Sequence, residues 1–205
     1  MSVRGFERAD EGYTAHMDGA ERGVFASVTR EVLALVRSVE GAPSAEPEAI
    51  VERAQDAAAG LPSFSVEAVP TPDDSALRRL FPAAVRDDDD ASAEFRRFAQ
   101  PELASAKVAR LERLAELFAD DAPTLVVDRA EAREVAAALT DVRLVVADRL
   151  GVVTDADAER VAASVYDAWD GDAEEAPILA TVHVLLTVLQ DTLVEEMLAD
   201  LRGRR

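Results

Sequence analysis

The amino-acid sequence predicts a mainly α-helical single domain over residues 1–205, with about six to eight helices and a small N-terminal β-hairpin. Apolar residues make up 49% of the chain but aromatic residues only 5%, so we expect a core of Leu, Val and Ala, as in packed helices. Apolar side chains recur at helical spacing over most of the second half. The connections between these helical stretches are short, which favours antiparallel neighbours.

The N-terminal residues alternate in the manner of two paired strands. Residues 4–17 alternate apolar and polar side chains around Asp10-Glu11-Gly12, which predicts a short hairpin. Asp18 is placed to cap a helix that follows. The apolar stripe of that helix consists of Val24, Phe25, Val28, Val32, Leu35, Val36 and Val39.

A segment rich in Pro, Ala, Ser and Glu follows this helix, and its composition predicts a mobile connector near residues 41–72. Within it, residues 47–59 favour a weak helix that Gly60 ends. Residues 75–81 favour a short helix, which stops near Pro82. We therefore expect one domain that this connector interrupts.

Two helices and a strand are expected in the middle of the chain. One helix is predicted over 91–99, and Pro101 is placed at the first position of a second helix over about 101–119, where proline is tolerated. Residues 124–127 favour a short strand because they read Thr-Leu-Val-Val. This strand would extend the N-terminal hairpin.

Three further helices complete the predicted fold. The helix over 129–150 ends at Gly151, a favourable residue just beyond a helix. Thr154 and Asp157 match the start of a capping box for a helix over 155–169. The last helix, residues 176–201, is apolar on most sides in its first half, which is typical of a central core helix.

The net charge of −19 at neutral pH excludes several classes of partner. Phosphate contacts need clustered cations, so tight non-specific binding of nucleic acid and binding to an anionic membrane are disfavoured. The helices over 129–150 and 155–169 have the short turn of a DNA-binding pair, but the second contains a single basic residue, Arg160. We therefore expect no direct DNA binding by the chain alone.

No cysteine is present, which excludes disulfides, thiolate metal sites and thiol nucleophiles in the chain. The N-terminus lacks the apolar stretch of a signal peptide, and the apolar run over 176–189 is too short and too polar to span a bilayer, so we expect a cytoplasmic protein. His16 and His183 have no second ligand at metal-binding spacing, and His183 is expected to be a core histidine. The acidic run over 87–90 favours a solvated loop over a cation site. No catalytic residue, metal ligand or cofactor is predicted.

Three cations lie on or beside the apolar faces of predicted helices. Lys107, the chain's only lysine, falls between Leu114 and Phe118 when positions are placed about 100° apart. Its ammonium either reaches water along an apolar stem or is paired in a cleft. Arg149 lies in the apolar face of its helix and can compensate the helix dipole there, while Arg143 sits at the rim of that face.

Arg96 and Arg97, between Phe95 and Phe98, favour either a basic patch or internal ion pairs with nearby carboxylates. Trp169, near a helix end, is typical of a core or interface residue rather than a ligand-stacking one.

Three motifs in order carry a family resemblance. EFRRFAQPELASAKVARLERL resembles the pattern EFRRLTExDLRxxKxxNL, TDVRLVVADRLGV resembles NDxRLALGxRLGV, and VLLTVLQDTLVEEML resembles WLGWLQESLVxAL. The resemblance covers nearly the whole chain except the 41–72 connector. The family is an actinobacterial one of unknown function that includes the actinomycete oxidative-stress regulator AosR.

The resemblance implies a non-catalytic intracellular regulator that acts with the transcription machinery through a protein partner such as a sigma factor or RNA polymerase. Carried over by match, the positions of interest are Arg96, Arg97, Lys107, Asp141, Arg143 and Arg149. Two departures matter: the missing cysteines rule out a thiol switch within the chain, and Thr140 stands where the family usually has Asn. Regulation by oxidation is therefore not expected here.

Four hypotheses follow. The leading one is a regulatory interaction protein, whose acidic surface suits a basic partner. The second is a small-molecule or anion sensor in which Lys107, Arg143 and Arg149 converge on a helix-lined pocket. The third, an enzyme that depends on carboxylates, has no motif to support it. The fourth is an assembly scaffold or homodimer, which exposed apolar surface on the last helix would favour.

Overall fold

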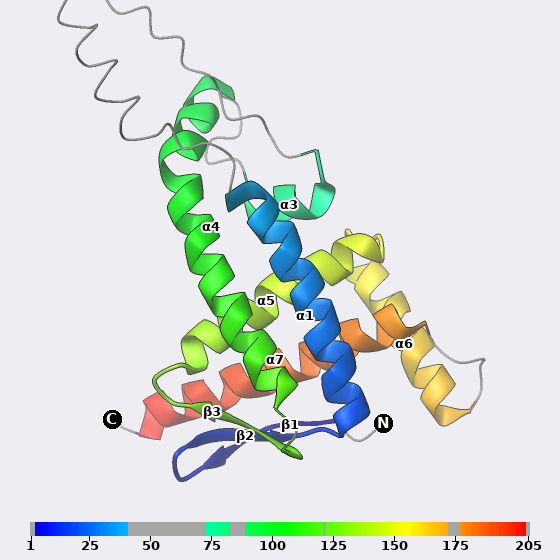
Figure 1. Ribbon diagram of the computed structural model, residues 1–205. Coiled ribbons are helices and arrows are strands. Elements are labelled where there is room, and N and C mark those ends of the chain that lie inside the picture. The colour runs from blue at the N-terminus through cyan, green and yellow to red at the C-terminus, as the bar shows by residue number, and fades with distance from the viewer. Residues whose placement is uncertain (1–2, 41–72, 83–88, 121, 172–176, 204–205) are drawn as a thin grey trace, which may run out of the picture.

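The computed structural model describes residues 3–40, 73–82, 89–120, 122–171 and 177–203, with the backbone alone for residues 40 and 89–98 (Figure 1). The described elements, in chain order, are β1 (Arg4–Ala9), β2 (Gly12–His16), α1 (Gly19–Glu40), α3 (Ser75–Leu80), α4 (Asp89–Ala119), β3 (Thr124–Asp128), α5 (Ala132–Arg149), α6 (Asp155–Asp170) and α7 (Ile178–Gly203).

These elements confirm the predicted fold class: six described helices and a hairpin that a third strand extends. The predicted connector over 41–72, with its weak helix over 47–59, lies outside the described residues.

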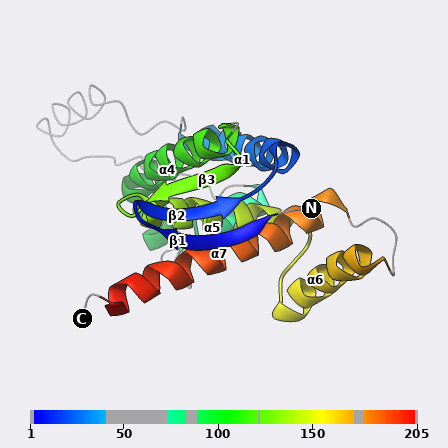
Figure 2. The ribbon, with the colours of Figure 1, turned by 90° about the horizontal axis from the view of Figure 1, so that it is seen from below.

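The sheet is antiparallel with strand order β1-β2-β3. Tyr13 lies opposite Arg8 on one side and Val127 on the other, and the register of β1 against β2 shifts between Arg4 and Glu7. The strand predicted over 124–127 therefore joins the hairpin edge as expected. Figure 2 shows the sheet stacked across α7, with β1 next to that helix.

The contact between β1 and α7 depends on a close approach of the β1 backbone to the Thr192 side chain. The amide of Phe6 donates a hydrogen bond of 2.8 Å to the Thr192 hydroxyl. A Cβ atom on Gly5 would lie 2.5 Å from a Thr192 methyl carbon, so only glycine fits there without a shift. At the far end of α7, Asp200 accepts hydrogen bonds of 3.0 Å from the Tyr13 hydroxyl and from Arg129.

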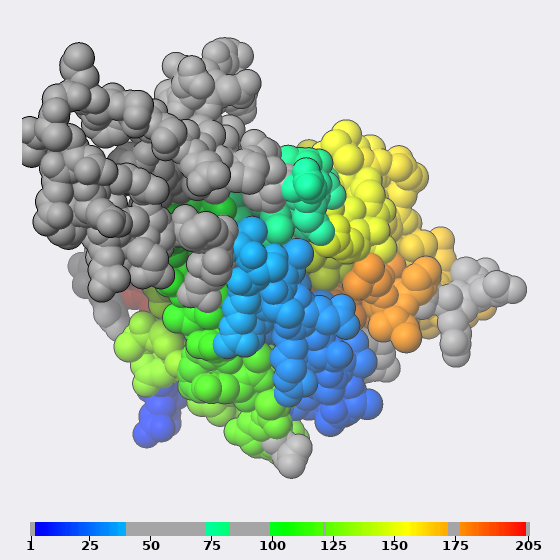
Figure 3. All heavy atoms as spheres, turned by 45° about the horizontal axis from the view of Figure 1, so that its top comes forward, coloured from blue at the N-terminus to red at the C-terminus, as the bar shows by residue number. Residues whose placement is uncertain are grey.

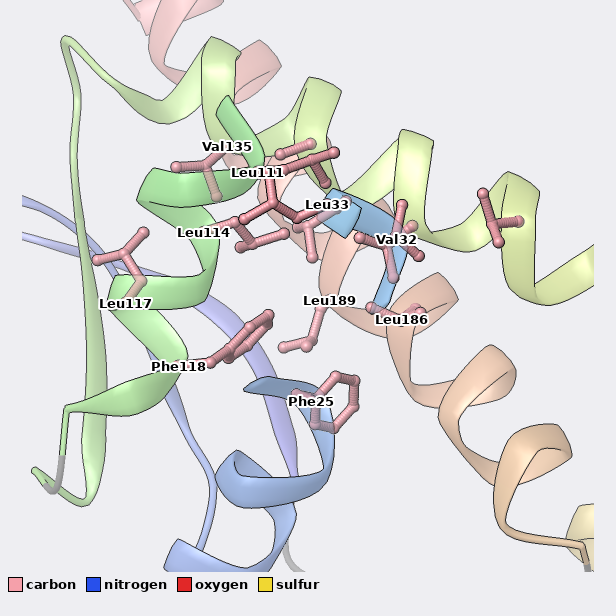
Figure 4. Close-up of a cluster of buried hydrophobic side chains, with 14 of the residues drawn as sticks. Phe25, Val32, Leu33, Leu111, Leu114, Leu117, Phe118, Val135, Leu186 and Leu189 are labelled. Atoms are coloured by element: carbon pink, nitrogen blue, oxygen red, sulfur yellow. The ribbon is translucent and has the colours of Figure 1, made fainter. Parts of the chain in front are cut away.

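Helices α1, α4, α5 and α7 enclose the main core, and α3 packs on α5 (Figure 4). The rings of Phe25 on α1 and Phe118 on α4 stack with centroids 5.2 Å apart. Leu186 and Leu189 bring α7 into the same cluster, and both are fully buried. The prediction of a central last helix is thus confirmed, since nine residues of α7 are buried, Thr181 and His183 among them.

A buried arginine fastens α1 to the end of α4. Arg22 is only 2% exposed, and its guanidinium donates to the backbone carbonyls of Leu117, Phe118 and Ala122. The carbonyls of Leu117 and Phe118 lie in the last turn of α4, where a helix leaves its carbonyls unsatisfied and carries partial negative charge, and Ala122 follows the helix. At the start of α1, Asp18 and Glu21 cap the helix reciprocally, as predicted for Asp18.

One element prediction is corrected. The sequence predicts separate helices over 91–99 and 101–119, but α4 is continuous from Asp89 to Ala119 with Pro101 inside it. Proline removes one backbone donor and is disfavoured inside helices, so tertiary packing overrides a local stop signal here.

Helix α7 is longer than the apolar run over 176–189, which is too short and too polar to predict a membrane span. Among the described residues it is the one helix whose length and composition would allow it to cross a membrane. Its buried face packs against α5 and β1 instead.

Candidate functional site

The most unusual polar feature of the described core is an ion pair between α4 and α5. The Lys107 ammonium lies 2.6 Å from Asp141 Oδ1, and the two side chains are 16% and 6% exposed. Both residues belong to the predicted set. Of the two readings for Lys107, the structure shows the paired cation rather than a side chain that extends into water.

The surroundings of this pair are largely apolar. The ammonium lies 5.8 Å from the ring centroid of Phe81, the residue that ends α3, so an aromatic face covers one side of the cation. The second oxygen of Asp141 is buried and has no hydrogen-bond partner among the described residues. The pair therefore neutralises two buried charges and joins α3, α4 and α5 at one point.

A second polar contact crosses from α5 to α7 one residue earlier in the chain. The Gln190 side-chain amide donates a hydrogen bond of 2.9 Å to the Thr140 hydroxyl, which in turn donates to the carbonyl of Ala136. Thr140 is the position at which the chain departs from the family pattern. Its hydroxyl thus links the two helices.

Arg143 faces α7 rather than the Lys107 pair. Its guanidinium lies 4.0 Å from Asp191, at the limit of an ion pair, and it is 29% exposed. His183, on the same side of α7, is buried as predicted; burial lowers its pKa, and the positive charge of Arg143 lowers it further. A neutral imidazole is therefore the form that this part of the core favours.

Arg149 sits in a third place, at the end of α5. It lies 2.6 Å from Asp74, the residue that caps α3, and 3.4 Å from Asp148. The hydrogen bond from Arg149 lowers the pKa of Asp74 and raises the pKa of Arg149 itself. Arg79 completes this cluster through Asp148, at 3.0 Å. Arg149 thus does more than compensate the dipole of its own helix: it bridges two helices.

Of the four predicted site residues whose side chains the structure describes, only Lys107 and Asp141 contact each other. Arg143 and Arg149 each pair with other carboxylates, so the three cations do not converge on one anion pocket. The geometric basis of the anion-sensor hypothesis is therefore absent. The side chains of Arg96 and Arg97 lie outside the described part of the chain.

A hollow beside the Arg149 cluster offers a different kind of site. It has a volume of about 340 Å³ between α1, α5 and the start of α7, and its lining is Val28, Glu31, Val32, Leu35, Val145, Val146, Arg149 and Leu179. Six of the eight lining residues are aliphatic, and the two charged ones have opposite signs. Figure 3 shows this face, where the blue α1, the yellow-green end of α5 and the orange start of α7 adjoin. We call this hollow the α1–α5–α7 groove.

The lining of the groove is mainly aliphatic and contains few polar groups. Within the described ranges no three His, Cys, Asp or Glu side chains are grouped so that they would hold a metal ion. The groove contains no histidine and no hydroxyl nucleophile, and its one carboxylate, Glu31, is exposed.

Sequence reasoning missed the residues that define these contacts. Asp148 and Gln190 fall inside the resembling motifs but were not singled out there, nor was Asp74, because they become partners only when α3 and α7 pack on α5. The groove was partly visible in the sequence, because Val28 and Leu35 belong to the predicted stripe of the first helix and are only half-buried in the structure.

The fold and these contacts define a small helical domain with an edge sheet, a desolvated ion pair at its centre and an aliphatic groove on one face. Residues 3–197 match the model of a family described as a domain of unknown function (DUF2017), and the chain belongs to that family. Comparison with curated proteins and with solved structures finds no match.

Proposed function

We propose that this chain is a non-catalytic regulatory protein that acts by binding another protein, with the α1–α5–α7 groove as its docking surface. The groove carries the proposal because its wall is aliphatic and reachable from outside: Val28, Leu35 and Leu179 are all half-buried rather than enclosed. Apolar grooves between helices take the apolar face of an amphipathic helix, whose side chains enter at helical spacing.

The chemistry of the groove argues for a helix rather than an anion. Its volume of about 340 Å³ accommodates only a few aliphatic side chains. The one cation in its lining, Arg149, is already held by Asp74 and Asp148. Two exposed apolar residues, Val24 on α1 (37% exposed) and Ile178 on α7 (73% exposed), extend the apolar surface available to a partner.

The negative net charge of the chain indicates that the binding surface of its partner is positively charged. A net charge of −19 attracts a basic surface and speeds its association, and it repels an acidic one. The occupant we propose is therefore an amphipathic helix with a basic polar face. The resemblance of the three motifs to regulators that act with the transcription machinery supports a sigma factor or RNA polymerase as the protein that carries this helix.

A binding experiment with purified components tests this proposal. The chain is immobilised and offered RNA polymerase core, free sigma factor and the reconstituted holoenzyme at about 0.1 M salt, where charges act over about 10 Å. The groove variant carries Val28→Gln and Leu179→Gln, and the control carries Ala34→Gln, an exposed position of α1 outside the groove lining. Thermal unfolding checks that both variants stay folded.

We expect the wild type and the Ala34→Gln control to retain a sigma factor or the holoenzyme. The groove variant should lose at least about tenfold in affinity, because it forfeits two apolar contacts of about 1.5–3 kcal/mol each. Equal retention by the groove variant would remove the groove as the docking surface. If no transcription protein is retained by any version, the regulatory proposal itself fails.

A further inference from the structure

The outer face of α6 carries an exposed aromatic pair. Tyr166 and Trp169 are 48% and 44% exposed, and their rings meet edge to face with centroids 5.5 Å apart. Trp169 is the chain's only tryptophan, and the prediction of a core or interface residue leaves its half-exposed position to be explained. Aromatic rings of this size are usually covered, so their exposure marks a candidate interaction surface.

The same face carries carboxylates at helical spacing. At about 100° per residue, Asp155, Glu159, Tyr166 and Asp170 fall within about 60° of one another around the helix, and Trp169 lies beside them. Val165, the one fully buried residue of α6, packs against α7 from a neighbouring face, about 80° around the helix from Asp155. We call this outer stripe of carboxylates and rings the α6 acidic-aromatic face.

Most carboxylates of α6 form no ion pair within the described fold. The helix has five acidic residues and one basic residue, Arg160, which pairs with Asp157. Asp157 also accepts hydrogen bonds from the backbone amides of Val153 and Thr154, so its role is to cap the helix. The other four acidic residues of α6 form no ion pair with any residue that the structure describes, which leaves their charge available to a partner.

The position of α6 makes this face reachable. Figures 1 and 2 both place the helix at the periphery, beside the first half of α7 and away from the sheet. A glycine with positive φ lies on each side of the helix: Gly151, at 69°, follows α5, and Gly171, at 81°, is the C-cap of α6.

We propose that the α6 acidic-aromatic face binds an arginine-rich segment of a partner protein. A guanidinium stacks on an aromatic face while its donors reach neighbouring carboxylates, and this face presents both groups side by side. Arginine is favoured over lysine because its planar group stacks and forms paired hydrogen bonds, whereas an ammonium acts as a point charge. A second copy of the chain is disfavoured because two molecules of charge −19 repel each other.

This surface is distinct from the α1–α5–α7 groove, and the inference stands whether or not the groove binds a helix. None of the residues on the α6 acidic-aromatic face lines the groove. Variants of one surface therefore report on that surface alone.

The test uses the full chain and two short synthetic peptides, one alternating Arg and Ser and one alternating Lys and Ser. Because Trp169 is the only tryptophan, its emission reports contact at α6 directly. Anisotropy of a labelled peptide gives the affinity at about 0.1 M salt. We expect the arginine peptide to shift Trp169 emission and to bind at least about threefold more tightly than the lysine peptide.

Two matched pairs of substitutions distinguish binding at this face from a general effect of the net charge. Glu159→Gln with Asp170→Asn should weaken the arginine peptide about fivefold to tenfold, because two local charge partners are lost. Glu7→Gln with Glu195→Gln removes the same charge from exposed positions elsewhere and should weaken it at most about twofold. Tyr166→Leu should abolish the preference for arginine while it keeps apolar area. Asp155 and Asp157 are left intact because they stabilise the start of the helix.

Three results would overturn the inference. Equal weakening by the two charge-matched pairs would show that binding follows net charge alone. Binding without a change in Trp169 emission would place the peptide elsewhere on the surface. A dimer in sedimentation equilibrium, with Trp169 emission that shifts as the protein is concentrated, would identify a second copy as the occupant.

Discussion

Replacing Lys107 with methionine should be among the most damaging single substitutions in this core. The change keeps the length and much of the apolar stem of the side chain, and it removes the ammonium that lies 2.6 Å from Asp141. The carboxylate is 6% exposed, and one of its oxygens already lacks a partner among the described residues, so no replacement donor is at hand.

The expected loss in the free energy of unfolding comes from the buried charge that remains without its partner. Leaving one member of a buried ion pair uncompensated costs about 3–5 kcal/mol, and we expect Lys107→Met to fall in this range. Asp141→Leu should cost less, about 1–2 kcal/mol, because Lys107 is 16% exposed and its flexible stem can carry the ammonium toward water. The double variant Lys107→Met with Asp141→Leu removes both charges and should lie within about 1 kcal/mol of the wild type.

Urea unfolding of the wild type, both single variants and the double variant gives the four free energies of a double-mutant cycle. We expect the two single costs to exceed the double cost by at least about 2 kcal/mol, because the charges depend on each other. Circular dichroism checks that each variant retains its helical content before unfolding.

Additive effects of the two substitutions on the free energy of unfolding would contradict this prediction. If Lys107→Met costs under about 1 kcal/mol and the single costs sum to the double cost, the pair behaves as an exposed one. In that case the ion pair would be no part of what holds α4 against α5.

Two further predictions concern other buried ionic groups. Arg22→Met should destabilise the domain by about 3 kcal/mol, because three backbone carbonyls, two in the last turn of α4 and one just after it, lose their donor, and differential scanning calorimetry should show a Tm lower by about 6–12 °C. His183 has a lowered pKa in the folded state, so below about pH 6.5 the unfolded chain binds more protons and the free energy of unfolding should fall as the pH falls from 7 toward 5. Urea unfolding of His183→Leu across that range should show a weaker pH dependence, and an unchanged slope would contradict this assignment.

The helix ends and the hairpin were predictable because their signals are local. The caps formed by Asp18 and Thr154 join residues three positions apart, so the sequence alone contains both partners. The hairpin at Gly12 and the helix end before Gly151 follow from turn chemistry in the same way. Pro101 shows the limit of local signals, because packing of α4 against α1 and α5 carries the helix through it.

The candidate site was only half predictable. Both members of the central pair were singled out, but their pairing was not, because Lys107 and Asp141 lie 34 positions apart. From the sequence, the Lys107 ammonium either reaches water along its apolar stem or is paired in a cleft. Only the packing of α4 against α5 decides between these two alternatives. Arg149 is a similar case, since Asp74 is 75 positions away and becomes its partner through α3.

By itself, the sequence determined most of the described elements, their caps, the absence of thiol chemistry and the sign of the surface charge, because each depends on neighbouring residues or on composition. The tertiary structure alone decided which cations are buried and paired, where an aliphatic groove opens, and that α6 turns its aromatic rings outward. These properties depend on how the helices rotate and approach one another. That arrangement depends on packing contacts throughout the core, so it cannot be deduced from a stretch of a few residues.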